Sequence, residues 1–169
     1  MKIHIHLFAI ILLWSSCIEP KVYPIIPEIT FARFTIKDSV DVLGNQILLC
    51  KLTMTVKDGD GNIGLEKDDT LGYRHPDSLH YHNLFVKQYE KINGEFQEVE
   101  LLIPTNYRTP FYETEGQNRA LKADIEVKFE YLHFDYDTII YDFFIYDRDL
   151  NQSDINASPE LVPADLLNN

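Results

Sequence analysis

The stretch Asn45–Asp58, NQILLCKLTMTVKD, has the pattern of a β-strand with one buried face. Lys51, Thr53 and Thr55 alternate with apolar neighbours, and successive side chains of a strand point to opposite faces. The residues expected on the inner face are Leu48, Cys50, Leu52, Met54 and Val56. Cys50 is therefore predicted to be a small buried residue of the core rather than a reactive thiol.

Alternation and turn residues in the rest of the chain predict further strands of the same kind. Asn93-Gly94 favours a tight hairpin, and 137–147, DTIIYDFFIYD, is apolar on nearly both faces, as expected of a central strand. The seven predicted strands span 28–36, 46–57, 80–91, 95–102, 119–130, 137–147 and 157–163.

Seven antiparallel strands at these intervals predict an all-β fold, an immunoglobulin-like or fibronectin III-like sandwich. A small jelly roll or an open barrel is the alternative. If the strands alternate in direction, the connections after the second, fourth and sixth strands lie at one end of the domain. The start of the first strand lies at the same end.

Composition limits the classes of function. The chain has 169 residues, 45% of them hydrophobic, which suits one globular domain. Its ten Tyr and ten Phe favour strands. A formal net charge of −12 repels a phosphate backbone, so no nucleic-acid partner is expected.

The N-terminus has the features of an export signal, predicted at 1–16. Lys2 precedes the apolar run Leu7–Trp14, which is too short to span a membrane. The sequence LLWSSC, ending at Cys17, resembles a bacterial lipobox. The resemblance implies that Cys17 becomes the lipidated first residue of the mature protein, carrying fatty acyl chains such as palmitate; an ordinary cleaved signal peptide is the alternative.

The next segment, 17–27, is predicted to be an extended tether. Pro20, Pro24 and Pro27 disfavour both a helix and a central strand. The tether would connect the lipidated Cys17 to a single β-sandwich domain at 28–169.

Side chains with oxygen atoms recur at alternate positions at the start of KDGDGNIGLEKDD, Lys57–Asp69. Asp58, Asp60 and Asn62 match the first three ligands of a calcium loop, although Ile63 replaces the usual glycine. The segment YDRDLNQSD has a similar spacing. The candidate calcium ligands are Asp58, Asp60, Asn62, Glu66, Asp69, Asp147, Asp149 and Asn151. Alternatively, these are residues that ordinary polar turns favour.

The connection 103–118, IPTNYRTPFYETEGQN, is long for a structureless loop. Its residues Tyr107, Arg108, Phe111 and Tyr112 are predicted to form an aromatic platform beside a cation, suited to a sugar ring or a peptide. The alternative is that these aromatic rings fold back and close the end of the sandwich.

The sequence predicts a protein without enzymatic activity. It contains no Gly-x-Ser-x-Gly nucleophile motif. His80 and His82 have the spacing of two zinc ligands on one face of a strand, but no recurring zinc pattern completes the set.

Three segments together, VKDGDGNIGLEKDD, EGQNRALKADIEV and IYDRDLNQSD, resemble the immunoglobulin-like lipoproteins of Bacteroidota. The resemblance implies a β-sandwich anchored by lipid to the outer membrane, facing the periplasm or the cell surface. It implies no activity. Two functions remain open: a binding module for a glycan or a protein, and a structural or accessory subunit of an envelope complex.

Overall fold

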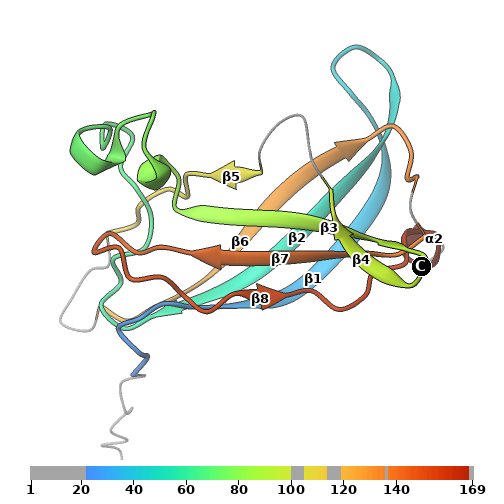
Figure 1. The fold of residues 1–169 in the computed structure, drawn as a ribbon. Helices are drawn as coiled ribbons and strands as arrows, with labels where there is room; N and C mark the ends of the chain where they lie inside the picture. The colour runs from blue at the N-terminus through green and yellow to red at the C-terminus, as the bar shows by residue number, and fades with distance from the viewer. Residues whose placement is uncertain (1–21, 100–104, 114–118, 136, 168–169) are drawn as a thin grey trace, which may run out of the picture.

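The computed structural model describes residues 22–99, 105–113, 119–135 and 137–167, so the predicted signal peptide and Cys17 lie outside the described residues. The described chain is mostly β and forms two antiparallel sheets (Figure 1). An all-β fold is therefore confirmed.

The first sheet has three strands in the order β1-β2-β6. They are β1 (Glu28–Val40), β2 (Gln46–Asp58) and β6 (Leu121–Tyr131). The first strand is longer than the predicted 28–36, because β1 and β2 continue as a hairpin to a turn closed by Asp41. The Asp41 carboxylate accepts hydrogen bonds of 2.8 Å from the backbone N–H groups of Leu43 and Asn45.

The second sheet has the order β4-β3-β7-β8, and β5 also pairs with β3. Its strands are β3 (Leu84–Ile92), β4 (Glu95–Glu98), β5 (Asn106–Tyr107), β7 (Ile139–Ile145) and β8 (Asn156–Ala157). Asn93 (φ 53°) and Gly94 (φ 89°) form the predicted hairpin turn between β3 and β4. As predicted, β7 lies inside its sheet.

The third predicted strand begins later than expected. Leu79–Tyr81 forms a short 3₁₀ turn, η3, so residue 80 is not in a strand. The Ser78 hydroxyl accepts a hydrogen bond from the His80 N–H (3.2 Å) and so caps this turn. His80 and His82 consequently do not share one face of a strand.

The fourth predicted strand, 95–102, is confirmed only for Glu95–Glu98, and its part at 100–102 lies outside the described residues. β4 ends at Glu98, and β5, which lies within the predicted connection 103–118, pairs with β3 further along. Two segments therefore share one edge of the sheet. With this division the described residues contain eight strands, not seven.

The last predicted strand, 157–163, is mostly irregular. Only Asn156–Ala157 pairs regularly with β7, and a short helix, α2 (Pro163–Leu167), follows. The hydroxyls of Ser158 and Ser153 accept hydrogen bonds of 3.0 Å from the backbone N–H groups of Tyr141 and Ile145. In both places a side-chain oxygen accepts the hydrogen bond that a carbonyl of a regular neighbouring strand would accept.

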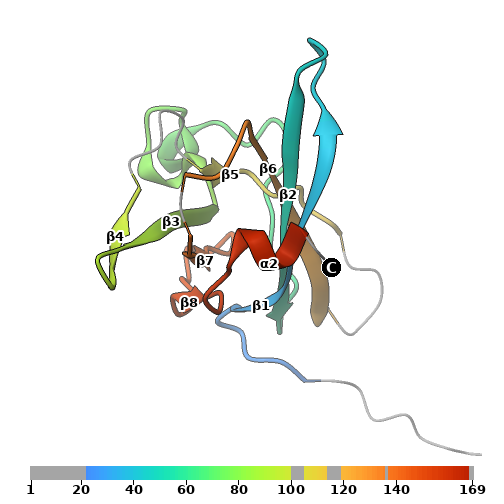
Figure 2. The same cartoon turned by 90° about the vertical axis from the view of Figure 1, so that its right-hand side faces the viewer.

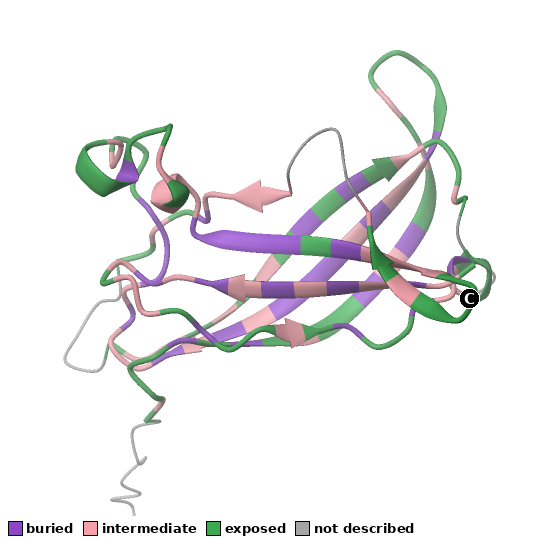
Figure 3. Ribbon diagram, in the orientation of Figure 1, coloured by how far each residue is buried: buried purple, intermediate pink, exposed green. Residues whose placement is uncertain are grey.

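The hydrophobic core lies between the two sheets, and Figure 2 gives a view in which the sheets are seen apart. The ring of Tyr141 in β7 lies 5.5 Å from that of Phe34 and 5.2 Å from that of Phe129, both in the opposite sheet. Figure 3 shows the buried positions that repeat along β3 and β7. The predicted inner face of β2 is confirmed for Cys50, Leu52, Met54 and Val56, which are fully buried, and Leu48 is half-buried against the core. Thr53, on the opposite face, is buried as well.

Cys50 is a free thiol, and burial raises its pKa to about 12. The thiol is therefore neutral, as expected of a core residue. No helix in the described part of the chain is long and apolar enough to cross a membrane.

Replacing Leu52 tests how much the core between the two sheets contributes to the stability of the fold. Leu52 is fully buried in the middle strand of its sheet, so Leu52→Ala leaves a cavity. We expect a loss of about 2–5 kcal/mol in the free energy of unfolding, measured by urea denaturation and circular dichroism. The control, Lys37→Ala on the exposed side of β1, should change it by less than about 0.5 kcal/mol. Equal effects of the two variants would contradict this description of the core.

Candidate functional site at the loop end

Three connections far apart in the sequence meet at one end of the fold, as predicted. The Leu65 N–H, in the β2–β3 connection, donates a hydrogen bond to the Thr109 carbonyl (2.8 Å), in the β5–β6 connection. Ile63 forms an isolated bridge with Asp147, which follows β7. We call this assembly the loop end; it lies on the left in Figure 1.

The N-terminal segment also reaches the loop end. The Pro24 carbonyl accepts a hydrogen bond of 2.7 Å from the Gly59 N–H, immediately after β2. A side chain at Gly59 would collide with the carbonyl oxygens of Tyr23 and Pro24, so this close approach requires glycine. The expectation that the chain enters the domain beside these loops is confirmed.

Arg108 holds the connections together. Its guanidinium donates hydrogen bonds to the carbonyls of Tyr81 (2.6 Å), Glu66 (3.0 Å) and Asp69 (3.0 Å). It also lies over the ring of Tyr81, 4.6 Å from the centroid. Arg108 therefore cross-links the β2–β3 loop. The guanidinium that was predicted to contact a ligand thus forms hydrogen bonds within the protein instead.

Arg74 performs a second cross-link that the sequence did not indicate. Its side chain is 3% exposed, forms an ion pair with Asp69 (3.2 Å) and donates a hydrogen bond to the Arg148 carbonyl (2.8 Å). Burial of an arginine is favourable only when its charge and donors are matched in this way. The β2–β3 and β7–β8 connections are thereby fixed to each other.

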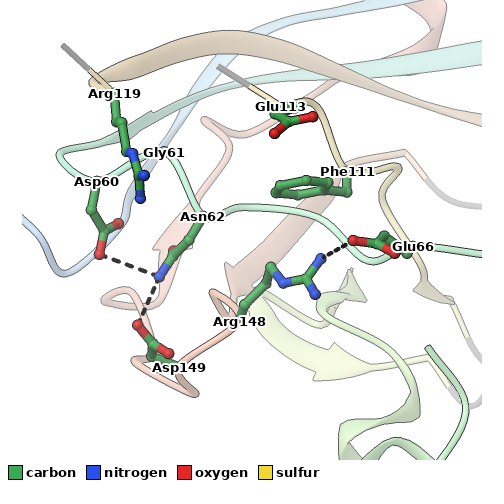
Figure 4. Close-up of a pocket in the computed structure, with 9 residues that line it drawn as sticks. All are labelled: Asp60, Gly61, Asn62, Glu66, Phe111, Glu113, Arg119, Arg148 and Asp149. Carbon is green, nitrogen blue, oxygen red and sulfur yellow. Dashed lines mark hydrogen bonds and ion pairs between the residues drawn. The ribbon is translucent and has the colours of Figure 1, made fainter. Parts of the chain in front are cut away.

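A cleft of about 440 Å³ opens at the loop end (Figure 4). Its lining carries four carboxylates, two guanidinium groups and one aromatic ring. The Arg148 guanidinium lies over the ring of Phe111, 4.6 Å from its centroid, and pairs with Glu66 (3.3 Å). The lining residues are Asp60, Gly61, Asn62, Glu66, Phe111, Glu113, Arg119, Arg148 and Asp149.

The four residues predicted as an aromatic platform are dispersed. Tyr107, in β5, packs against the core, and burial raises its pKa. Tyr112 is 66% exposed and lies at a separate hollow beside β6. Only Phe111 lines the cleft, and the cation beside it is Arg148 rather than Arg108. The predicted single platform is thus wrong in its geometry.

The acidic residues at the loop end have several different partners. Asp147 accepts hydrogen bonds from the backbone N–H (2.8 Å) and the side-chain amide (2.7 Å) of Asn151, so these two residues close their own turn. Glu66 and Asp69 form ion pairs with arginines. Among the described residues, no group of three or more His, Cys, Asp or Glu is arranged to hold a metal. The eight predicted calcium ligands are therefore not one cluster.

Asp58, Asp60 and Asn62 differ from the others. Asp58 is fully buried because it continues the inward phase of β2 that includes Met54 and Val56. One carboxylate oxygen, Oδ2, accepts a hydrogen bond from the Asn62 N–H (2.8 Å). The Oδ1 atoms of Asp58, Asp60 and Asn62 are buried and have no hydrogen-bond partner among the described residues.

The pKa of Asp58 is raised to about 7. Burial is the main cause, and the nearby carboxylates of Asp60 and Asp147 add to it. The Asn62 N–H that donates to Asp58 acts in the opposite direction. The negative charge of Asp58 is therefore costly in this position unless a cation is close.

Sequence reasoning did not find Arg148 and Arg119 in the cleft. Arg148 lies between Asp147 and Asp149, in a segment whose acidic spacing drew attention to the carboxylates alone. Arginines in the loops of a strongly acidic chain could have indicated these two residues, since clustered carboxylates favour a positive partner nearby.

Arg108→Ala tests whether this residue supports the loops. The change removes three hydrogen bonds to carbonyls, so we expect a loss of about 1–3 kcal/mol in the free energy of unfolding. Hydrogen exchange should become faster in residues 66–81. The control, Arg33→Ala on the exposed side of β1, should leave both quantities unchanged. Unaltered exchange in Arg108→Ala would show that the arginine does not order this loop.

Comparison with known proteins finds no matching family model, no matching curated protein and no matching solved structure. Function must accordingly be inferred from the loop end itself.

Proposed function

We propose that the protein is a lipid-anchored protein of the cell envelope whose loop end binds a glycan or a protein. The observation that carries this proposal is the cleft in which Arg148 covers Phe111 among four carboxylates. The proposed role is binding rather than catalysis.

The chemistry of the cleft suits a polar ligand with an apolar face. The Phe111 ring supplies a flat surface, and the guanidinium groups of Arg119 and Arg148 supply donors. The carboxylates of Glu113 and Asp149 supply acceptors. Sugar rings, and peptide segments that carry both charges, offer hydroxyls or charged groups for these partners and an apolar surface for the ring.

The arrangement of strands supports the same proposal. One sheet contains β1, β2 and β6, and the other contains β3, β4, β5, β7 and β8. We interpret this as an immunoglobulin-like or fibronectin III-like sandwich, in which loops at one end form binding sites on a rigid scaffold. The resemblance to immunoglobulin-like lipoproteins of Bacteroidota is consistent with this interpretation and with an outer-membrane location.

An accessory role in an envelope complex is the second candidate, favoured by the β1–β2 hairpin. Its end carries three exposed apolar side chains, Val40 (53% exposed), Val42 (101%) and Leu43 (82%). The hairpin points away from the N-terminal segment in both views (Figures 1 and 2). In a lipid-anchored protein this hairpin would extend away from the membrane, where a partner protein can contact it.

Phe111→Ala and Tyr112→Ala form a matched pair for the binding proposal. Both remove an aromatic ring from adjacent residues, but only Phe111 lines the cleft. Against an array of bacterial and host polysaccharides and glycoproteins, we expect Phe111→Ala to bind at least about tenfold more weakly, because the aromatic surface of the cleft is lost. Tyr112→Ala should bind like the unchanged protein. Equal binding by all three would exclude the cleft and favour the accessory role.

Cys17→Ala tests the membrane anchor. Without the thiol there is no atom to acylate, so we expect no incorporation of labelled palmitate and no lipid-dependent retention in the membrane fraction of a bacterial host. Cys50→Ala is the control, because Cys50 is the other cysteine and is buried in the core. Continued labelling of Cys17→Ala would contradict the lipoprotein assignment.

A further inference from the structure

We propose that the turn Asp58–Asn62 binds one calcium ion through the side-chain oxygens of Asp58, Asp60 and Asn62. The proposal rests on this turn alone and is independent of whether the cleft binds a ligand.

Three unpartnered oxygen atoms carry the proposal. The Oδ1 atoms of Asp58, Asp60 and Asn62 are buried without a hydrogen-bond partner among the described residues. A buried polar atom left without a partner destabilises the fold, and more so if it is charged. Three such atoms on alternate residues of one turn indicate that a partner of these oxygens is missing, not that three separate defects coincide.

The side chains of the turn are already brought together. The Asn62 backbone N–H donates to Asp58 Oδ2 (2.8 Å), and the Asn62 side-chain amide donates to Asp60 (3.3 Å) and Asp149 (3.0 Å). Figure 4 shows the amide of Asn62 directed at both carboxylates. Gly61, with φ 67°, allows the backbone to turn sharply between these residues.

A positive partner suits these oxygens best, because two of the three belong to carboxylates. Asp58 is fully buried, and its Oδ1 atom has no hydrogen-bond partner among the described residues. Within the described residues, no Lys, Arg or His nitrogen forms an ion pair with Asp58 or Asp60, whereas Glu66 and Asp69 both pair with arginines. A bound cation would supply the charge that the protein side chains do not.

The donor set favours calcium among biological cations. Two carboxylates and an amide are hard oxygen ligands, which exclude the soft metals that prefer sulfur or imidazole. Calcium accepts six to eight oxygens in a flexible arrangement, so water and backbone carbonyls can complete its coordination. Magnesium requires a nearly ideal octahedron and usually retains several waters, which a buried turn accommodates poorly.

Calcium at this turn would stabilise the whole loop end. Gly59, within the turn, binds the Pro24 carbonyl, and Asn62 contacts Asp149 in the β7–β8 connection. An ion that fixes Asp58, Asp60 and Asn62 would therefore fix the N-terminal segment and one wall of the cleft. Asp147 and Asn151, which bond to each other, would support the turn without binding the ion.

The test is calcium binding by the full chain, purified in detergent and treated with EDTA. Isothermal titration with calcium chloride should give one site per chain. At a calcium concentration 100 times the Kd, Tm should rise by roughly 5–10 °C. The same concentration of magnesium should raise Tm by less than half as much.

Three variants make the test specific. Asp60→Ala should lose the heat of binding and the rise in Tm. Asp60→Asn, which retains the shape of the side chain and is the safer variant for folding, should weaken binding at least tenfold. Asp77→Ala, an equal change of charge at an exposed residue of the same loop, should bind calcium like the unchanged protein. No binding heat in the unchanged chain, or undiminished binding by Asp60→Asn, would overturn the proposal.

Discussion

The continuous inward phase of strand β2 is the constraint on which the rest of the structure depends. Cys50, Leu52, Met54 and Val56 are fully buried on one face of the strand, and the next residue in the same phase is Asp58. The periodicity that builds the core therefore places a carboxylate at its edge. The alternation of side chains along β2 thus connects the hydrophobic interior to the acidic turn. Without a bulge or a break in the strand, the side chain two residues after Val56 must point to the same face as Val56.

Arginines hold together the loop end, where the many carboxylates would otherwise repel one another. The chain has a net charge of −12, and acidic residues are frequent in the connections at the loop end. Arg74 and Arg108 cross-link these connections through carbonyls and Asp69, while Arg148 covers Phe111 in the cleft. The planar guanidinium suits this role because it can donate several hydrogen bonds in fixed directions at once. The result is that the β2–β3 and β7–β8 connections, which supply residues of the cleft, are held together.

The position of the N-terminal segment relates the two proposed functions to each other. The segment contacts Gly59 at the loop end, so a lipid anchor would hold the cleft near the membrane and the β1–β2 hairpin away from it. A ligand of the cleft would then approach beside the tether, and a partner protein would contact the exposed hairpin. Both surfaces can act in one molecule, since they lie at opposite ends of the same pair of sheets.

The sequence by itself determined the all-β class, the inner face of β2, the burial of Cys50, the Asn93-Gly94 hairpin and the meeting of three connections at one end. The first four follow from local periodicity or from a turn pair that adopts positive φ, and the last follows from strands that alternate in direction. Lipidation of Cys17 remains a prediction from a motif. Only the tertiary structure decided that serine hydroxyls replace part of the last strand, that Tyr107 and Arg108 support the fold, and that Phe111 and Arg148 form the cleft. These outcomes depend on which groups from distant segments come within hydrogen-bonding distance, and local sequence does not encode that proximity.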